Sequence, residues 1–418
     1  TTNCELLTTN SSMHALVFRY SLPKLALSKI AGAVAPAGYF GPWSPFRLED
    51  VPQPSPGSDG WVLVRTRLAG ICGSDAKQAF LRGDRDNPLT ALISFPHILG
   101  HEATGVVERV GPAVRTVAPG QRIVLNPWLS CAPRGFETPC RSCAAGDYQL
   151  CERFTEGRLP PSIHLGNCAA AGGAFAPYFT AHESQCIAVP DDVSDEQAVL
   201  ADPFSVQLHS VLRHPPVPGE PAVVYGCGTL GLMTVAMLRH LHPAVPVWAV
   251  ARHAHQAELA RALGASEVLP AEPTALIEAV ARLTGAAVLK PWSGVPWLMR
   301  GAGIVYDTVG SPSTIETAMR FASSRAKIVV SGVEAPRRFE WTPYYFKELT
   351  LVGSNAFAVE DFEGRRMHAM QVYFELVRRG LDLSSLITHR YALGEYQRAF
   401  LAMHDHGRSG AVKQVFAF

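Results

Sequence analysis

The sequence predicts an α/β protein with two domains, a β-rich N-terminal domain and a doubly wound parallel sheet. The length of 418 residues is more than one hydrophobic core usually organises. Short strands separated by glycine and proline fill the N-terminal part, whereas strands alternate with apolar helices from Pro221 onward. The change in pattern near Pro221 is the clearest sign of a second domain.

Composition excludes several classes of protein. The formal net charge is only +1, so there is no basic footprint for nucleic acid and no polybasic membrane patch. The longest apolar run, Val223 to Leu238, is interrupted by glycines and is shorter than the ~20 residues of a membrane span. Nine cysteines follow an N-terminus without a basic-then-apolar secretory pattern. We therefore expect a cytoplasmic protein in a reducing compartment, with neither nucleic acid nor membrane as a partner.

The N-terminal strands are predicted from alternating apolar residues and the turns between them. Residues 15–18, 61–68 and 103–110 have this pattern, and residues 114–124 indicate a turn followed by a strand. These short elements favour a Greek-key or barrel-like domain. Leu22 to Pro45 looks like an insertion, either a loop packed on the surface or a subunit contact.

Two short segments combine the ligand types that zinc prefers. Residues 70–75 (Gly-Ile-Cys-Gly-Ser-Asp) supply the thiol of Cys72, and residues 99–102 (Leu-Gly-His-Glu) supply an imidazole and a carboxylate. Asp75 is spaced to accept the second ring proton of His101, and Ser74 offers a hydroxyl that passes a proton. The alternative is a buried cysteine and a hydrogen-bonded core histidine.

Four further cysteines indicate a structural zinc site. They are Cys131, Cys140, Cys143 and Cys151, with gaps of eight, two and seven residues rich in Gly, Pro and Asp. The first gap is wide, but two doublings of loop length cost only about 1.2 kcal/mol. Structural zinc contributes about 10–16 kcal/mol in small peptides, so the wide gap is tolerable. Two disulfides or four free thiols are the alternatives.

A glycine-rich turn predicts a dinucleotide site. The apolar strand 222–225 leads into Gly226, Gly228 and Gly231 in the spacing G-x-G-x-x-G, followed by an apolar helix to Leu241. These glycines let the backbone approach a pyrophosphate at the helix N-terminus, and Thr229 and Leu230 complete the turn. Strands at 245–250, 304–307, 327–330 and 349–352 alternate with helices at 255–263, 274–283 and 314–322. Residues 285–300 look like another insertion.

The segments around this sheet complete the predicted organisation. A helix capped by Ser194 covers 194–200 and a second covers 206–213. After Gly353 we expect a helix at 361–379, a strand at 386–391, a helix at 393–404 and a closing strand at 412–418. This tail is predicted to return to the N-terminal domain. The predicted limits are 13–204 with 353–418 for the β-rich domain, and 205–352 for the domain with the doubly wound sheet.

With these motifs in order, the chain resembles the zinc-dependent medium-chain alcohol and polyol dehydrogenases from Ala15 to Phe418. The landmarks are residues 70–75 and 100–102, the four cysteines, residues 202–203, 226–231 and 307–310, and Lys413. The resemblance implies a GroES-like catalytic domain beside the Rossmann domain. It also implies contacts of Val309 and Lys413 with the cofactor.

The resemblance implies that Cys72 and His101 bind a catalytic zinc, and that the remaining protein ligand is Glu102 or Asp202. A carboxylate at position 202 favours the polyol, sugar or amino-alcohol branch. In the family mechanism, zinc lowers the pKa of the bound alcohol and hydride passes to the nicotinamide. Ser74 would accept the alcohol proton. Several relatives have a relay histidine where this chain has Lys77, which leaves the end of the relay open.

The cofactor preference has its own signal. The second Rossmann strand should end in an acidic residue that binds the adenosine ribose of NAD, but here it ends at Val250 and is followed by Ala251 and Arg252. A guanidinium at this place favours NADP over NAD, because it binds a 2′-phosphate in a bidentate manner. A solvated surface arginine in an enzyme that uses NAD loosely is the alternative.

Together, the sequence predicts an NAD(P)-dependent zinc alcohol or polyol dehydrogenase with two zinc ions per subunit. Its partner is a small-molecule alcohol or carbonyl compound, and we expect a homodimer or homotetramer. Two alternatives remain. One is a reductase of aldehydes, ketones or activated double bonds on the same fold, and the other is a non-catalytic NADP(H)-binding protein.

Overall fold

The computed structural model describes residues 11–56, 60–83, 87–332 and 340–418. The chain forms two compact units. Unit 1 contains the residues up to Asp202 together with Met370–Phe418, and unit 2 contains Pro203–Ala369. The domain limits predicted above remain a prediction.

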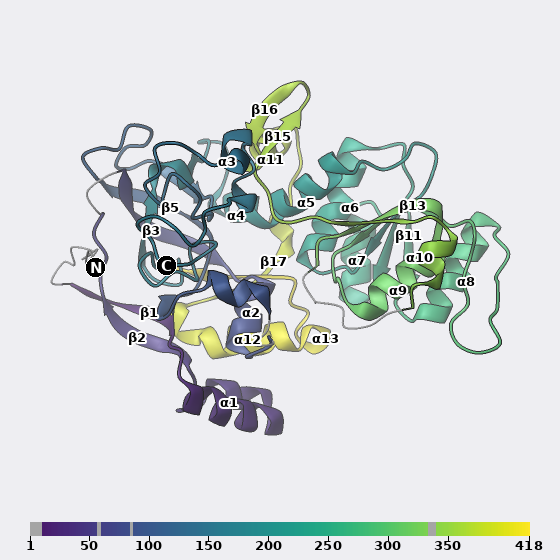
Figure 1. Cartoon of the computed structure of the whole chain (residues 1–418), viewed down its shortest axis with the longest axis horizontal. Helices are drawn as coiled ribbons and strands as arrows, with labels where there is room; N and C mark the ends of the chain where they lie inside the picture. Colours follow the sequence, from purple (N-terminus) through teal and green to yellow (C-terminus); the bar gives the residue numbers. More distant parts are fainter. Residues whose placement is uncertain (1–10, 57–59, 84–86, 333–339) are drawn as a thin grey trace. The chain divides into compact units, whose positions relative to one another are not determined.

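Unit 1 is built on a seven-stranded sheet in the order β17-β18-β3-β5-β6-β8, with β7 also paired to β3. A three-stranded sheet, β2-β1-β4, completes it (Figure 1). The C-terminal strand β18 pairs antiparallel with β3, as predicted for the returning tail. The strand bounds are β1 Ser12–Phe18, β2 Phe46–Pro52, β3 Trp61–Gly70, β4 His97–Ile98, β5 Glu102–Val110, β6 Arg122–Leu125, β7 Tyr178–His182, β8 Cys186–Ala188, β17 Ile387–Tyr391 and β18 Lys413–Ala417.

The helices of unit 1 are short, apart from those near its two sequence ends. Their bounds are α1 Leu22–Val34, α2 Gly73–Ala79, α3 Arg141–Ala145, α4 Asp195–Val199, α12 Tyr396–His404 and α13 His406–Ser409. The 3₁₀ turns are η1 Pro36–Phe40, η2 Pro88–Leu92, η3 Tyr148–Leu150, η4 Glu183–Gln185, η5 Ser384–Leu386 and η6 Leu393–Glu395. Ser194 caps α4 as predicted, since its hydroxyl accepts from the Gln197 N–H at 3.1 Å.

The insertion at 22–45 is folded into helical elements, so the first of its two predicted alternatives, a surface loop, is wrong, and the second, a subunit contact, stays a prediction. It contains α1 and η1, and its glycines serve close contacts rather than turns. A Cβ at Gly32 would lie 2.3 Å from the ring of Tyr39, and a Cβ at Gly38 would lie 2.3 Å from the carbonyl oxygen of Ala31. The two elements are therefore locked together, and Phe40 of η1 is buried in the core of unit 1.

Unit 2 is a six-stranded parallel sheet in the order β11-β10-β9-β12-β13-β14. The strands are β9 Ala222–Tyr225, β10 Val247–Ala251, β11 Glu267–Pro270, β12 Ala302–Asp307, β13 Ala322–Val330 and β14 Thr350–Gly353. The helices are α5 Ala201–Arg213, which begins at the end of unit 1, α6 Thr229–Leu241, α7 Ala254–Ala262, α8 Pro273–Thr284, α9 Pro312–Phe321 and α10 Thr342–Phe346. This is the predicted doubly wound sheet, with the order reversing at β9.

Further segments differ from the sequence prediction. Strand β11 was not predicted, because its residues are few and only partly apolar. The helix expected at 361–379 begins only at α11 (Ala369–Arg378). Before it, β15 (Val359–Phe362) and β16 (Arg365–His368) form a hairpin, whose turn at Glu363 and Gly364 has φ values of 48° and 76°. Positive φ at two successive residues is incompatible with a right-handed helix. Helix α2 was also not predicted.

Among the described residues, no helix is long and apolar enough to cross a membrane.

Candidate functional site

The register of β3 against β5 brings the two predicted zinc-binding segments together. Gly70, at the end of β3, is paired with Glu102, at the start of β5. Cys72 follows the end of β3 and His101 directly precedes β5, so their side chains meet at the same end of the strand pair. Ligand atoms of Cys72, His101 and Glu102 all lie within 4.8 Å of one another.

Asp75 ties the cysteine and the histidine to each other. It lies in the first turn of α2, where its Oδ2 accepts from the backbone N–H of Cys72 at 2.9 Å. Its Oδ1 lies 3.5 Å from Nδ1 of His101. Burial would raise the pKa of Asp75, but the charge of His101 lowers it on balance. Ser74, half-buried in the same turn, is the neighbour of Asp75 on α2.

Glu102 is already paired with a cation. The Nζ of Lys413 on β18 donates to Oε2 of Glu102 and to the carbonyl oxygen of Ile71, the latter at 3.1 Å, and both side chains are buried. Burial would lower the pKa of Lys413, but the charge of Glu102 raises it. The predicted pyrophosphate contact of Lys413 remains a prediction, and its side chain is committed to Glu102.

Asp202 is a second carboxylate beside this site. It is 4 % exposed, and its Oδ2 has no hydrogen-bond partner among the described residues. Burial and the nearby charge of Glu102 raise the pKa of Asp202 to about 8. A buried carboxylate oxygen without a donor is costly unless a cation meets it. The ligand atoms of Cys72, His101 and Glu102 lie close enough to share one zinc ion, and Asp202 adds an unsatisfied carboxylate oxygen near them.

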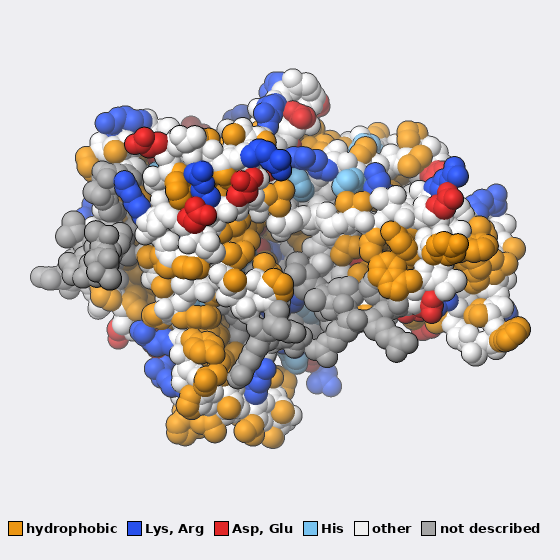
Figure 2. Space-filling view, viewed as in Figure 1, with side chains coloured by type: hydrophobic (Ala, Val, Ile, Leu, Met, Phe, Trp, Pro, Cys, Tyr) orange, Lys and Arg blue, Asp and Glu red, His pale blue; other side chains and the backbone are white. Residues whose placement is uncertain are grey.

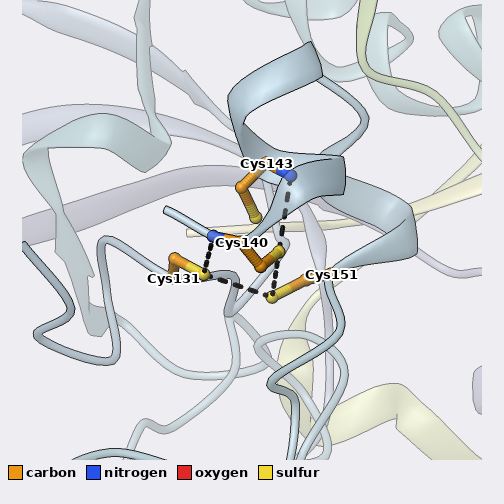
Figure 3. A group of neighbouring side chains, drawn as sticks. All are labelled: Cys131, Cys140, Cys143 and Cys151. Carbon is orange, nitrogen blue, oxygen red and sulfur yellow. Dashed lines mark hydrogen bonds between the residues drawn. The ribbon is translucent and has the colours of Figure 1, made fainter. Parts of the chain in front are cut away.

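The four cysteines of the lobe point toward one another (Figure 3). All four are free thiols whose sulfur atoms lie within 4.8 Å of one another. The Sγ atom of Cys151 lies 3.7 Å from that of Cys131 and 4.0 Å from that of Cys140. A tetrahedral site with Zn–S bonds of about 2.3 Å has sulfur atoms about 3.8 Å apart. The cluster thus has the size of a Cys₄ zinc site, and the spacing does not fit disulfides.

Backbone N–H groups already face these sulfur atoms. The N–H of Cys140 donates to Sγ of Cys131 at 3.3 Å, and the N–H of Arg153 donates to Sγ of Cys151 at 3.4 Å. The N–H of Cys143 donates to Sγ of Cys140 at 3.5 Å. Burial would raise the pKa of Cys140, but the backbone N–H groups of Cys143 and Glu152 bring it to about 7. Donors placed in this way favour thiolates, the form that binds zinc.

A buried arginine closes the same lobe. Arg134 lies in the wide gap between the first two cysteines and is 1 % exposed. Its guanidinium donates to five backbone carbonyl oxygens and one hydroxyl, those of Leu129, Glu156, Leu159, Pro160 and Ser162, with Ser162 accepting at both atoms. Burial lowers the pKa of Arg134. The segment between Cys131 and Cys140 thus supplies an arginine whose hydrogen bonds connect it to Leu129 and to residues 156–162.

The glycine turn of unit 2 lies at the switch point of the sheet. Gly226 has φ of 95°, and a Cβ at Gly231 would lie 1.7 Å from the carbonyl oxygen of Gly226. Gly228 is the N-cap of α6, where Thr229 and Leu230 form the first turn. Val309, just after β12, contacts the position where a Cβ of Gly226 would be. The backbone amides at this helix start are arranged as an anion site requires.

Arg252 follows β10 directly and is exposed. Burial raises the pKa of Tyr225, at the end of β9, to about 12. The charge of Arg252 acts in the opposite direction, which places Arg252 near this phenol. The guanidinium is therefore solvent-exposed at the carboxyl end of the sheet.

One residue near the site had no sequence signal. The ring centroid of His164 lies 4.5 Å from that of His101 and 6.1 Å from that of Trp128. Nδ1 of His164 bonds to the carbonyl oxygen of Leu165, and Nε2 faces the amide nitrogen of Asn167 at 3.4 Å. Burial, and then the charge of His101, lower the pKa of His164 to about 3. The ring of His164 is therefore neutral and packs against His101, a candidate metal ligand.

Family models match both halves of the chain. The model described as an alcohol dehydrogenase GroES-like domain matches residues 58–191, and that described as a zinc-binding dehydrogenase matches residues 229–371. An L-threonine 3-dehydrogenase of Anaeromyxobacter dehalogenans is 30% identical and aligns over 87% of this chain and 93% of its own length. That of Legionella pneumophila is 29% identical over 87% and 95%.

Solved structures have the same fold. An alcohol dehydrogenase from Escherichia coli, complexed with NADH, has a TM-score of 0.73 with 23% identity, over 98% of this chain and 100% of its own. Galactitol-1-phosphate dehydrogenase from Escherichia coli has a TM-score of 0.70 with 21% identity, over 97% and 100%. The chain belongs to the zinc-dependent medium-chain dehydrogenase/reductase family and is an NAD(P)-dependent oxidoreductase that acts on a small-molecule alcohol or its carbonyl product.

Proposed function

We propose that Cys72, His101 and Asp202 bind the catalytic zinc of this dehydrogenase. The unsatisfied Oδ2 of buried Asp202 is the observation that carries the assignment. Glu102 is the carboxylate with an oxygen atom within 4.8 Å of the ligand atoms of Cys72 and His101, but this carboxylate is neutralised by Lys413. Oδ1 of Asp75, 3.5 Å from Nδ1 of His101, would accept the Nδ1 proton on a small closure and leave Nε2 for the metal.

A zinc ion in this site would lower the pKa of an alcohol, so that the alkoxide forms near neutral pH. Ser74 accepts the alcohol proton and passes it outward, with Lys77 on the same helix as the next group. Asp75 keeps the imidazole of His101 in one orientation while this happens. His164 restricts the other side of that imidazole, since its ring is fixed by its own hydrogen bonds.

The Rossmann domain, residues 205–352, would bind the nicotinamide cofactor, and residues 13–204 with 353–418 would form the catalytic domain. Gly226, Gly228, Thr229, Leu230 and Gly231 would cradle the pyrophosphate, with Val309 beside them. Arg252 would bind the 2′-phosphate, so we propose NADP as the preferred cofactor. Cys131, Cys140, Cys143 and Cys151 would hold a second, structural zinc.

The substrate we propose is a secondary alcohol of the polyol or hydroxy-amino-acid class. The carboxylate at Asp202 and the L-threonine 3-dehydrogenase relatives support this class. We also propose that the enzyme acts in the cytoplasm as a homodimer or homotetramer.

The test is metal analysis combined with cofactor titration on chelator-washed protein. We expect close to two zinc ions per subunit, tighter binding of NADPH than of NADH, and NADP-linked oxidation of an alcohol from a panel that includes L-threonine and polyols. The variant Cys72→Ala should lose turnover but keep cofactor binding. Unchanged turnover in Cys72→Ala would refute the catalytic zinc site, and cofactor binding without any zinc would indicate a zinc-free reductase or a binding protein.

A further inference from the structure

Helix α1 presents a continuous apolar face to solvent. Only Ser28 of this helix is buried, while Leu22, Leu27, Ile30 and Val34 are exposed, the last two by 67 % and 86 %. Figure 2 shows hydrophobic side chains gathered at the lower edge of the molecule, where α1 lies in Figure 1. These exposed apolar side chains lie next to one another on one helix, so they form a patch rather than single scattered residues.

The helix is held rigidly beneath that face. The hydroxyl of Ser28 donates to the carbonyl oxygen of Trp43 at 3.1 Å, and the ring of Tyr39 packs against Gly32. The following turn is anchored by Phe40, whose ring stacks edge-on against Phe80 at 5.4 Å. We therefore expect no rearrangement within unit 1 that would bury the exposed apolar side chains.

The charged residues of the segment that contains α1 have one sign. From Tyr20 to Phe46 the sequence contains two lysines, Lys24 and Lys29, and no acidic residue. A step of about 100° per residue puts Ile30 at the centre of the apolar face and the two lysines at its opposite margins. No ion pair joins either lysine to a described residue. Both ammonium groups therefore remain available to an anionic partner.

The size and charge of the face disfavour a second copy of the chain. A helix of 13 residues is about 20 Å long and about 10 Å wide, so it offers only about 200 Å². A stable protein interface buries about 800 Å² per partner. Two such helices packed about a two-fold axis would also bring lysine margin against lysine margin, which is repulsive.

We propose that α1 is a peripheral docking element that inserts its apolar face into an anionic lipid surface. A bilayer accepts a single shallow helix, because the apolar side chains enter the acyl boundary while flanking lysines reach the anionic headgroups. Exposed Trp43, tied to the helix through Ser28, adds an aromatic side chain of the type enriched at that depth. The nearly neutral net charge of the whole sequence suggested no membrane contact, but folding isolates the two lysines beside the apolar face.

The experiment is co-sedimentation of the full chain with vesicles of phosphatidylcholine alone or mixed equally with phosphatidylglycerol. We expect binding to the mixed vesicles only. The variant Ile30→Glu should weaken that binding by about tenfold or more, because one buried aliphatic side chain contributes at least that factor. The pair Lys24→Glu and Lys29→Glu should abolish it. Trp292→Glu, a change at an even more exposed apolar residue of unit 2, is the control and should bind like the wild type.

All these variants should keep the wild-type melting temperature and dehydrogenase activity, since none lies in the proposed site. The proposal is overturned if the wild type does not sediment with mixed vesicles, or if Ile30→Glu binds as tightly as the wild type. A lower oligomeric mass of Ile30→Glu in sedimentation velocity, without vesicle binding by the wild type, would assign the face to a second copy instead.

Discussion

Glu102 and Lys413 form a buried ion pair directly over Gly70, where β3, β5 and β18 meet. A Cβ at Gly70 would lie 2.4 Å from Oε2 of Glu102 and 2.9 Å from Cε of Lys413, so only glycine leaves room for the pair. The pair connects β5, which begins with Glu102, to β18, which begins with Lys413. It therefore controls both the charge next to His101 and the closure of unit 1.

Lys413→Met should destabilise the protein by about 3–5 kcal/mol, because it leaves Glu102 buried without its cation. The double variant Glu102→Gln with Lys413→Met should recover most of that loss. Urea unfolding of the three proteins measures this. A Lys413→Met protein of normal stability that binds NADPH more weakly would instead support the pyrophosphate contact.

The two candidate carboxylates give different metal contents when each is neutralised. Asp202→Asn should lower the catalytic zinc occupancy, because it removes the unsatisfied oxygen atom that we assign to the metal. Glu102→Gln should retain zinc, because Glu102 is already balanced by Lys413. Zinc per subunit after dialysis against a chelator separates them. The opposite pattern, with zinc lost only in Glu102→Gln, would assign the ligand to Glu102.

Arg134→Met should speed the release of the structural zinc and lower stability by about 3–5 kcal/mol, because several buried carbonyl groups lose their donor. Zinc release to a colorimetric chelator and thermal unfolding are the measurements. Arg141→Met is the matched control, since Arg141 lies in the same lobe with a highly exposed side chain. If the two variants release zinc at the same rate, Arg134 does not hold the lobe.

Arg252→Asp should shift the cofactor preference from NADP to NAD. Loss of charge-assisted hydrogen bonds to a 2′-phosphate should lower the ratio of the two kcat/KM values by about 10- to 100-fold. Arg261→Asp makes the same change at an exposed position of α7 and should leave the ratio as it is. An unchanged ratio in Arg252→Asp would mean that another group determines the preference.

The β15–β16 hairpin should become less firmly held in acid. Oε1 of Glu360 lies 2.6 Å from Nδ1 of His209, and Oε2 lies 3.3 Å from Nε of Arg213. Burial would raise the pKa of Glu360, but its bonds to His209 and Arg213 lower it on balance. A carboxyl with a lowered folded pKa contributes stability above its unfolded value near 4.5, and this is lost as the pH falls through the folded value.

Glu360→Gln should therefore cost about 2 kcal/mol at neutral pH and progressively less below pH ~4. Denaturant unfolding of both proteins across this range gives the difference directly. A constant difference at all pH values would show that the lost packing, and not the charge, explains the effect.

Sequence reasoning succeeded where the determining residues are neighbours in the chain. The glycine turn at 226–231 lies between its own strand and helix, and Cys72 lies three residues before Asp75. In both cases a local pattern specifies the geometry, so the prediction needs no knowledge of distant contacts. The meeting of His101 and Cys72 is different, because it depends on the pairing of β3 with β5 across a connection that contains α2, η2 and β4.

Sequence reasoning failed where a contact joins residues far apart in the chain, or where a helix is apolar on more than one side. Glu102 and Lys413 are separated by 311 positions, and His209 meets Glu360 across 151. Helix α1 has apolar residues on both its packed and its exposed sides, so it lacks the polar face by which surface helices are recognised. Gly32 and Gly38 suggested a loop, whereas they permit close packing of two helical elements.

The separation of Glu102 from Lys413 also sets an order of assembly during synthesis. The four-thiol lobe spans only residues 131–151, so all its ligands are present long before β18 is synthesised. Glu102 lacks its internal counter-charge until β18 pairs with β3. We therefore expect the four-cysteine site to load zinc before β18 is made, and the Cys72/His101 site to load it only after β18 has paired.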